Sequence, residues 1–401
     1  MTPGFDEDVL GDPQLIAQRD PSAVLLELAG AGAAVRRAVA VAPEWITGDL
    51  RAAGPPRAVL VAHDTLGSLV GDVLDAVVGP FAPLQRWERD EPPRWAGPGD
   101  ALLVASTDGW SPRLARLVEL SSRRGLAIAV AAPEQTPLEA AARHGRAALA
   151  AVPARRSARG APWTVLAPLL QAADALGAAA VPPALLTQIA DALDEVAAAC
   201  SPSADAVTNP AKLLALELGE SRAVLAGSGP LGAAGARRMA ALLALMAGEP
   251  ASVAILPGEA GAAAGLLTDS DADAAGGGDD PDGLDALFRD RVDDPRLPPR
   301  LLIFADPESG DSADSPGSPD APGDRAAAEL AGIARSLSAR ASVVAGAGPA
   351  PLARFAAAGA LADFACAYLS LVRGVDPGAP RSGEAPDYYG ADDRVGARGR
   401  S

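Results

Sequence analysis

Short apolar runs, each followed by a polar loop and then by a helical pattern, constrain the fold of this chain more than any other feature. RAVLVA at 57–62, ALLVAS at 101–106 and LAIAVAA at 126–132 are aliphatic runs of this kind. A continuous apolar run of this length is typical of a strand buried on both faces of a parallel sheet. The helical segments between the runs supply the crossovers that parallel strands require. Residues 45–155 are therefore predicted to form a doubly wound α/β domain.

The second half of the chain repeats this order. Strands are predicted within SRAVLAGSG at 221–229, PASVAIL at 250–256, LPPRLLIFAD at 297–306 and SARASVVAG at 338–346. Helical patterns separate these runs. A second α/β domain is therefore predicted over residues 201–377, and the shared order of strands and helices suggests a duplication.

The remaining segments differ in composition from the two α/β regions. Residues 1–44 have the pattern of a helical lead-in, and the Ala/Leu-rich residues 156–200 are interpreted as a helical linker between the domains. Residues 269–283 and 306–325 are acidic and rich in Gly, Ser and Pro, which predicts flexible surface insertions. Residues 378–401 are polar and are predicted to be a disordered tail.

The charge of the chain excludes some functions. Its 401 residues include 51 acidic and 34 basic side chains, which gives a formal charge of −17. A non-specific nucleic-acid binder needs a basic face, and an anionic membrane surface repels an acidic protein. Uninterrupted apolar runs stay below the roughly 18 residues of a membrane helix, and the N-terminal sequence MTPGFDEDVLGD is acidic. We therefore expect a cytoplasmic protein with neither nucleic acid nor membrane as a partner.

Few residues are available to hold a metal or a cofactor. The only cysteines are Cys200 and Cys366, which cannot form a disulfide framework or a four-ligand zinc site and are expected to be buried hydrophobes. The only histidines are His63 and His144, and the charged surroundings of His144 predict a solvated side chain. AGSG at 226–229 lacks the spacing of a dinucleotide fingerprint. We expect neither metal nor cofactor.

Hydroxyl side chains gather where two predicted strands end. Ser106 ends the strand predicted at 101–106, Thr107 and Ser111 lie in the loop after it, and Ser228 lies in the glycine loop after a strand of the second domain. Ligands of open parallel sheets bind at these carboxyl ends, and the free N–H groups that begin a helix favour a phosphate. The alternative is that these residues are ordinary helix caps or turn residues.

Several longer stretches resemble those of a known family. NPAKLLALELG at 209–219, GSGPLGAAGARRM at 227–239 and DFACAYLSLVRGVDP at 363–377 resemble the bifunctional phosphoglucose/phosphomannose isomerases, and the similarity in segment order runs over residues 5–378. The loop at 105–111 lies where that family has a Ser-Tyr-Ser-Gly-Asn-Thr phosphate loop, and it keeps the Ser/Thr character. The resemblance implies an α/β fold with two doubly wound parallel-sheet sugar-isomerase (SIS) domains, joined by a helical linker, in a homodimer.

The resemblance also implies where catalytic groups belong, and the sequence departs from the family there. The family moves a proton between C1 and C2 of a sugar phosphate, which requires a carboxylate base and a group that opens the ring. Counting from Ala236-Arg237-Arg238, the position of the family's glutamate is Leu245 and that of its lysine is Gly248. The stretch that supplies the ring-opening histidine corresponds to PGEAGAA at 257–263, which contains no histidine.

Three residues remain as substitute catalytic candidates. His63 lies beside Asp64 at a predicted strand end, where it is either an acid–base group or a polar loop residue. Glu249 and Glu259 lie close in sequence to the positions that the family uses. Losing a general base alone typically costs about 10²–10⁴ in rate, and Leu245 cannot carry a proton.

The sequence supports three functional hypotheses. In the first, the chain binds a hexose phosphate through Ser106, Thr107, Ser111 and Ser228, and isomerase activity is weak or lost. In the second, it is an active glucose-6-phosphate/mannose-6-phosphate isomerase whose catalytic residues have moved to His63, Glu249 and Glu259. In the third, it is a non-catalytic dimeric scaffold that regulates a sugar-phosphate enzyme.

Overall fold

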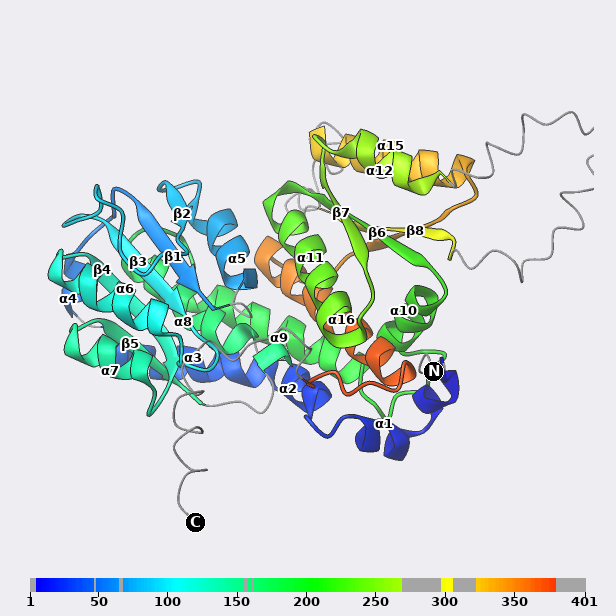
Figure 1. The fold of residues 1–401 in the computed structure, drawn as a ribbon, viewed down its shortest axis with the longest axis horizontal. Helices are drawn as coiled ribbons and strands as arrows, with labels where there is room; N and C mark the ends of the chain where they lie inside the picture. The colour runs from blue at the N-terminus through cyan, green and yellow to red at the C-terminus, as the bar shows by residue number, and fades with distance from the viewer. Residues whose placement is uncertain are drawn as a thin grey trace, which may run out of the picture.

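The strands of the protein form two separate parallel sheets (Figure 1). The computed structural model describes residues 5–46, 48–64, 68–153, 158–160, 162–268, 297–305 and 322–379. Sheet A contains β1 (Val59–His63), β2 (Leu84–Arg86), β3 (Ala101–Ala105), β4 (Ala127–Pro133) and β5 (Ala148–Val152) in the order β2-β1-β3-β4-β5. Sheet B contains β6 (Arg222–Ser228), β7 (Ala251–Leu256), β8 (Pro299–Phe304) and β9 (Arg340–Val344) in the order β7-β6-β8-β9. The α/β prediction with two parallel sheets is confirmed.

The apolar runs form the central strands because both faces of each sheet are covered. Every residue of β3 and of β8 is buried, as a continuous apolar sequence requires. All pairings between neighbouring strands are parallel, including β1 with β3 and β6 with β8. The first four strands of the two sheets share one order, which agrees with the predicted duplication.

Three described elements gave too little signal to be predicted individually. β2 has three residues at the edge of sheet A, with two of them exposed. β5 has the sequence ALAAV, in which every residue is apolar, so its alternating burial has no counterpart in an apolar–polar sequence period. α12 (Ala260–Leu267) is built almost entirely of alanine, glycine and leucine.

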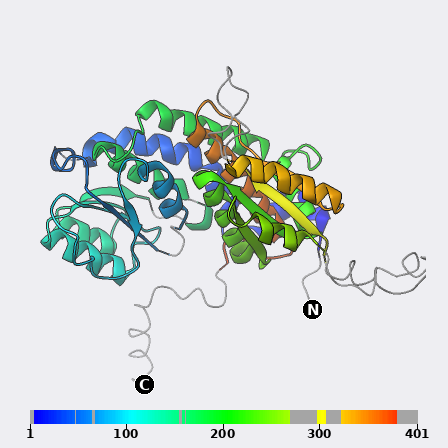
Figure 2. The same ribbon diagram turned by 90° about the horizontal axis from the view of Figure 1, so that it is seen from above.

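Helices cover both faces of each sheet. On sheet A, one face is covered by α3 (Ala31–Trp45), α4 (Gly48–Ala52), α5 (Ser68–Val78) and α8 (Pro162–Ala175), and the other by α6 (Pro112–Arg123) and α7 (Pro137–His144). On sheet B, one face is covered by α10 (Pro210–Gly219), α11 (Gly229–Leu242) and α16 (Pro351–Val372), and the other by α12 and α15 (Pro322–Ser336). The view from above in Figure 2 keeps the two sheets apart, with α3, in blue, beside the first.

Residues 156–200 do more than link the two sheets. Pro162–Ala173 of α8 are all buried, and α8 packs against α3, α5 and the strands of sheet A. This helix is therefore part of the first core as well as of the segment between the two sheets. Of the two helices α8 and α9 (Pro183–Ala199), only α9 bridges the two cores, because it packs against α3 of the first core and against α16 of the second.

The helical lead-in is divided between the two cores. The N-terminal elements η1 (Glu7–Gly11), α1 (Pro13–Arg19) and α2 (Val24–Ala29) contribute Val9, Leu10, Ile16 and Leu25 to the core of sheet B, whereas α3 packs on sheet A. The sequence predicts the helices but not this division, because the chain crosses from one core to the other inside a continuous helical pattern.

The described residues test the predicted flexible segments only at their ends. Residues 269–283, 306–321 and 380–401 lie outside the described part of the chain. Residues 322–325, expected to belong to a flexible insertion, form the first turn of α15 instead. Pro322 suits the first position of a helix, since its missing N–H would have no helical partner there.

One described helix has the length and hydropathy of a membrane span. It is α16, and 89% of its most apolar window is buried inside the protein. That burial identifies α16 as a core helix between α9, α10 and α11. Cys366 on this helix and Cys200 after α9 are both fully buried, which confirms the prediction for the two cysteines, and His144 is exposed as predicted.

Candidate functional site

The carboxyl edge of sheet A contains a group of hydrogen-bond donors directed at one carboxylate. Asp64 directly follows β1, and the connection from β3 to α6, named here the 106–111 loop, lies beside it. Oδ2 of Asp64 accepts hydrogen bonds from Ser106 Oγ at 2.9 Å, from Thr107 N at 2.6 Å and from Thr107 Oγ1 at 3.1 Å. Two of the four predicted binding residues are therefore brought together around a negatively charged group of the chain itself.

The 106–111 loop is held in shape by its own polar groups. Ser106 Oγ accepts a hydrogen bond from Gly109 N at 2.8 Å, and Asp108 Oδ1 accepts one from Trp110 N at 2.9 Å. Gly109 has a φ of +76°, and a Cβ at this position would lie 2.4 Å from Thr136 Oγ1. Glycine is therefore the residue that this turn requires. The loop is a preformed arrangement and not a flexible connection.

The other two predicted binding residues do not contact Asp64 in the hydrogen bonds described for them. Ser111 is the N-cap of α6 and its Oγ accepts from Leu114 N at 3.4 Å, as in the alternative reading of this residue. Ser228 ends β6 on sheet B, and its Oγ donates to Asp324 Oδ1 at 2.8 Å. Gly323 lets the start of α15 approach Ser228, since a Cβ there would lie 2.8 Å from the serine oxygen.

The environment of Asp64 disfavours the ionised form of its carboxyl group. Burial raises the pKa of the Asp64 carboxyl above its usual value, and the nearby negative charge of Asp108 acts in the same direction. The hydrogen bonds from Thr107 and Ser106 lower this pKa, but less than burial raises it. The loop thus holds an anion that it stabilises only in part.

The raised pKa of Asp64 predicts a pH-dependent difference in stability. The folded state binds the Asp64 proton more tightly than the unfolded state, so this contribution is complete below the unfolded pKa of about 3.9 and is lost as the pH rises through the folded pKa. The free energy of unfolding of the wild type minus that of Asp64→Asn should therefore fall as the pH rises above about 4. Urea titrations of both proteins at a series of pH values measure this difference, and a flat or rising difference contradicts it.

His63 and the arginine behind it frame the same edge. His63 ends β1, and its ring Nδ1 lies 2.7 Å from the Asp64 carbonyl oxygen, to which it donates when protonated. The ring packs on α5 at Gly71, where a Cβ would lie 3.0 Å from its Nε2. Arg113, in the first turn of α6, donates through Nη2 to the His63 carbonyl oxygen at 2.5 Å. The edge therefore has a cationic side chain near the loop.

A three-residue ion cluster connects this edge with the second domain. Asp72 of α5 accepts from Arg86 Nη2, at the end of β2, at 2.6 Å and from Arg237 Nη1 of α11 at 3.0 Å. The Asp72 side chain is 6% exposed. Since α11 belongs to the core of sheet B, this cluster joins the second domain to the amino-terminal half of α5 and to sheet A.

The three candidate catalytic residues do not meet. Glu249 precedes β7 and forms an ion pair with Arg373 at 2.9 Å. Glu259 follows β7, and its Oε2 accepts from Ile255 N at 2.7 Å. The two glutamates therefore lie at opposite ends of one strand, and His63 lies on the other sheet. This arrangement gives no acid–base pair on a shared substrate position.

The positions implied by the family resemblance also hold no acid–base group. Leu245 lies in the π-helical turn η4 (Leu243–Ala247) that ends α11, and Gly248 caps this turn with a φ of 74°. The segment that would supply a histidine runs into α12. Neither Leu245 nor Gly248 carries a side chain that could act as a base or a ring-opener.

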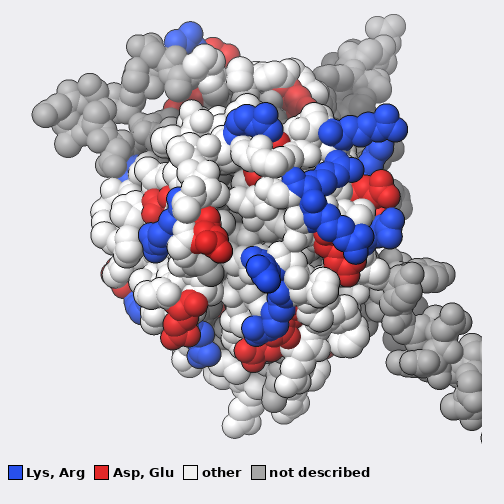
Figure 3. Space-filling view, turned by 90° about the vertical axis from the view of Figure 1, so that its left-hand side faces the viewer, with Lys and Arg blue, Asp and Glu red and all other residues white. Residues whose placement is uncertain are grey.

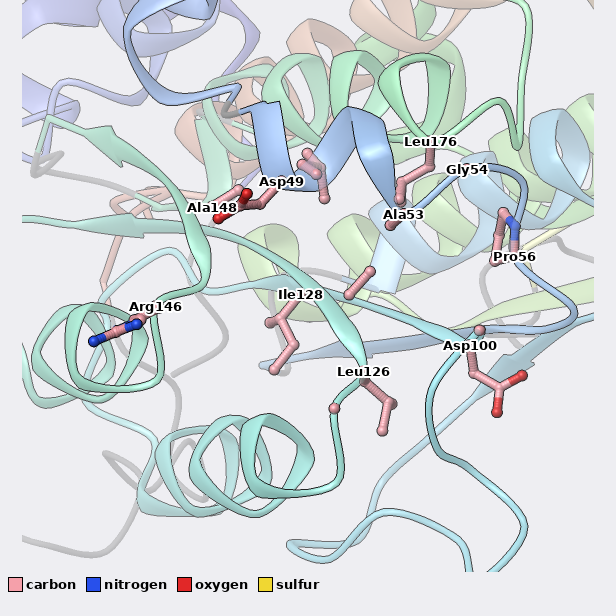
Figure 4. Close-up of a pocket in the computed structure, with 14 residues that line it drawn as sticks. Asp49, Ala53, Gly54, Pro56, Asp100, Leu126, Ile128, Arg146, Ala148 and Leu176 are labelled. Carbon is pink, nitrogen blue, oxygen red and sulfur yellow. The ribbon is translucent and has the colours of Figure 1, made fainter.

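Two cavities of the described protein lie away from the 106–111 loop. Figure 4 shows a cavity of about 310 Å³ that Asp49, Asp100, Ile128 and Arg146 help to line, at the amino edge of sheet A and so at the edge opposite the 106–111 loop. Another, of about 450 Å³, opens at the carboxyl ends of β8 and β9, and its walls are mainly alanine, valine and phenylalanine. The first cavity therefore has charged side chains in its wall but lies away from the predicted binding residues, and the second is mainly apolar.

Charges are mixed on the surface of the first domain. Figure 3 shows arginines along one side of this face, with acidic residues interleaved between them. The ion pairs include Arg116 with Asp90 at 3.2 Å and Arg143 with Glu139 at 2.8 Å. These two arginines of the first domain are therefore partly neutralised by neighbours.

Comparison with solved structures defines the class of fold. The chain is similar to tagatose-6-phosphate ketose/aldose isomerase from Escherichia coli, with 12% identity, a TM-score of 0.59, and coverage of 89% of this chain and 95% of that chain. It is also similar to the C-terminal domain of glucosamine-fructose-6-phosphate aminotransferase from Francisella tularensis, with 10% identity, a TM-score of 0.53, and coverage of 89% and 98%. At these identities the likeness concerns the fold, which is that of the phosphosugar isomerases.

The family comparison is more specific for the second half of the chain. Residues 207–382 match the family described as the bacterial phospho-glucose isomerase C-terminal SIS domain. The match agrees with an SIS domain of the phosphoglucose isomerase type in this segment and confirms the resemblance inferred from the sequence. No curated protein sequence matches the chain.

Proposed function

We propose that this protein binds a hexose phosphate at the carboxyl edge of sheet A and has lost the isomerase reaction. One observation carries the proposal. The 106–111 loop directs the donors of Ser106 and Thr107 at a single point, which an oxygen of the Asp64 carboxylate occupies. A set of preformed donors that holds a carboxylate oxygen can also hold a phosphate oxygen, because both are anionic acceptors.

The surroundings of the loop support a sugar phosphate as the ligand. Trp110 belongs to the same loop and is 54% exposed, so its indole offers an apolar face to solvent. Arg113 supplies a positive charge at the same edge. The family resemblance and the fold of the similar proteins point to the same ligand class.

The absence of a catalytic group among the described residues at the family positions supports the loss of turnover. Leu245 and Gly248 cannot exchange a proton, and Glu249 is engaged by Arg373. The 106–111 loop provides donors for binding a phosphate. Leu245 and Gly248 provide no group for proton transfer.

A thermal-shift titration tests the proposal. The wild type is titrated with fructose 6-phosphate, glucose 6-phosphate and mannose 6-phosphate, while isomerisation is followed by a coupled assay in the same samples. A ligand at 100 times its dissociation constant adds about 2.7 kcal/mol of stability, so we expect a raised melting temperature and no turnover. The double variant Ser106→Ala/Thr107→Ala should weaken binding by about 1–3 kcal/mol.

Each alternative function predicts another result. Turnover at a rate above the uncatalysed reaction contradicts the loss of isomerase activity and favours relocated catalytic residues. A melting temperature that none of the three sugar phosphates changes contradicts the binding function and favours a non-catalytic scaffold.

A further inference from the structure

The anion position of the 106–111 loop is filled by the chain itself. Three hydrogen bonds, from one backbone N–H and two hydroxyls, end on Oδ2 of Asp64. Asp64 is 7% exposed and Ser106 is fully buried, so these bonds lie inside the protein and not on a solvated surface. Any external anion that used the same donors would meet the Asp64 carboxylate at the position where its own oxygen has to lie.

A serine hydroxyl also meets a carboxylate at the carboxyl edge of sheet B. Ser228 at the end of β6 corresponds to Asp64 after β1, because β6 and β1 take the same place in the shared strand order. Its hydroxyl is bonded to Asp324, in the first turn of the helix that follows β8. The carboxylate therefore follows the first strand in sheet A, whereas in sheet B it comes from the segment after the third strand and the first strand supplies the hydroxyl.

The geometry points to Asp64 as a built-in competitor for the anion position of the 106–111 loop: a phosphorylated ligand binds there only when it displaces the Asp64 carboxylate from Ser106 and Thr107. The inference deepens the proposed function and rests on it, since it assigns a regulation to the same site. Two negative groups cannot share these donors, because at hydrogen-bond distances their repulsion in a partly buried site is large.

The exchange of the Asp64 carboxylate for a ligand anion is reversible because the hydrogen bonds of the loop do not fully compensate the burial of this carboxylate. Burial and the neighbouring Asp108 disfavour its ionised form inside the loop, and both effects are relieved when the carboxylate reaches solvent. A protein whose binding-competent form is populated only fractionally shows an affinity reduced by that fraction. If the open form is about 1–10% of the molecules, removing the competitor raises the affinity about 10–100-fold.

Calorimetric titration of four proteins tests the inference. The probes are inorganic phosphate and fructose 6-phosphate, and the proteins are the wild type, Asp64→Ala, Asp64→Asn and Asp100→Ala. Asp100 is the matched control, because it is a buried aspartate of the same sheet at the opposite edge, bonded to Arg57 and to Gly97 N. Near-ultraviolet circular dichroism establishes that each variant is folded.

The expected result is about tenfold or tighter binding of both probes by Asp64→Ala, a smaller gain for Asp64→Asn, and no gain for Asp100→Ala. Asn keeps an oxygen that Thr107 N can bond but removes the charge, so it competes less than Asp. Adding Ser106→Ala to Asp64→Ala should remove much of the gain, because the uncovered donor is then absent.

Two results overturn the inference. One is a folded Asp64→Ala, or a folded Asp64→Asn when the alanine variant does not fold, that binds no more tightly than the wild type. The other is an equal gain in Asp100→Ala. The proposed function fails separately: binding by the Asp64 variants without any binding of fructose 6-phosphate by the wild type supports the competitor and contradicts ligand binding by the native protein.

Discussion

Replacing Asp363 with alanine is expected to lower the free energy of unfolding by about 3–5 kcal/mol. Asp363 on α16 accepts two hydrogen bonds from Arg238 on α11, from Nε to Oδ1 and from Nη2 to Oδ2, each at 3.2 Å. Both side chains are almost completely buried, with 7% and 5% exposed. Removing the carboxylate would leave the guanidinium buried without its partner, which costs far more than the pair itself contributes.

The surroundings of this pair explain why the effect should be large. Arg238 Nη2 also donates to the Arg159 carbonyl oxygen at 2.6 Å, and Arg159 Nη1 donates to the carbonyl oxygens of Pro377 and Ala379, each at 2.8 Å. The network therefore joins α11, α16, the turn at 158–160 and the segment after α16. Burial raises the pKa of the Asp363 carboxyl despite the arginine beside it, so this charge is retained at a cost.

Urea unfolding followed by circular dichroism measures the effect. The matched control is the double variant Arg238→Met/Asp363→Leu, which removes both charges and keeps the volume. It should be much closer to the wild type in stability than Asp363→Ala is, because an apolar replacement of a buried ion pair is often neutral or stabilising. A loss below about 1 kcal/mol for Asp363→Ala would contradict the role given to this pair.

Replacing Lys212 with methionine is the second large effect, an expected loss of about 2–4 kcal/mol. Lys212 is the only lysine of the chain and is 1% exposed. Its Nζ donates to the carbonyl oxygens of Leu10 at 2.8 Å, Pro202 at 2.8 Å and Ala204 at 2.9 Å. Methionine has a similar length but no donor, so three carbonyl oxygens would be left without this partner.

The same unfolding experiment checks the prediction for Lys212. Leu213→Ala is the control, since Leu213 is the next residue on α10 and is 42% exposed. Its stability should stay within about 0.5 kcal/mol of the wild type. A Lys212→Met protein as stable as this control would show that the N-terminal segment is held to α10 by other contacts. A lowered pKa of Lys212, caused by its burial, is consistent with a cation enclosed by neutral carbonyls.

The local sequence determined the strands and most helices because their signals are local. A run such as ALLVAS predicts a strand that is buried on both faces of a sheet, and the burial of every residue of β3 confirms this prediction. Pro210 after Asn209 and Gly219 at the end of an apolar period likewise fix the limits of α10. The burial of Cys200 and Cys366 followed from small apolar neighbours in the same way.

Tertiary structure alone decided which elements share a core and which side chains meet. The alanine-rich pattern of α8 is the same for an exposed linker and for a buried helix, and only the sheet above it makes it part of the core. Ser106 and Thr107 were identified from their place after a strand, but Asp64 is 42 residues away from Ser106 and was recognised only as a neighbour of His63. The sequence therefore determined that hydrogen-bond donors gather at the carboxyl edge of sheet A. The pairing of β1 with β3 decided that these donors bind the Asp64 carboxylate. The physical reason is that a strand signal depends on adjacent residues, whereas the neighbour of a strand end depends on how parallel strands are ordered across the sheet.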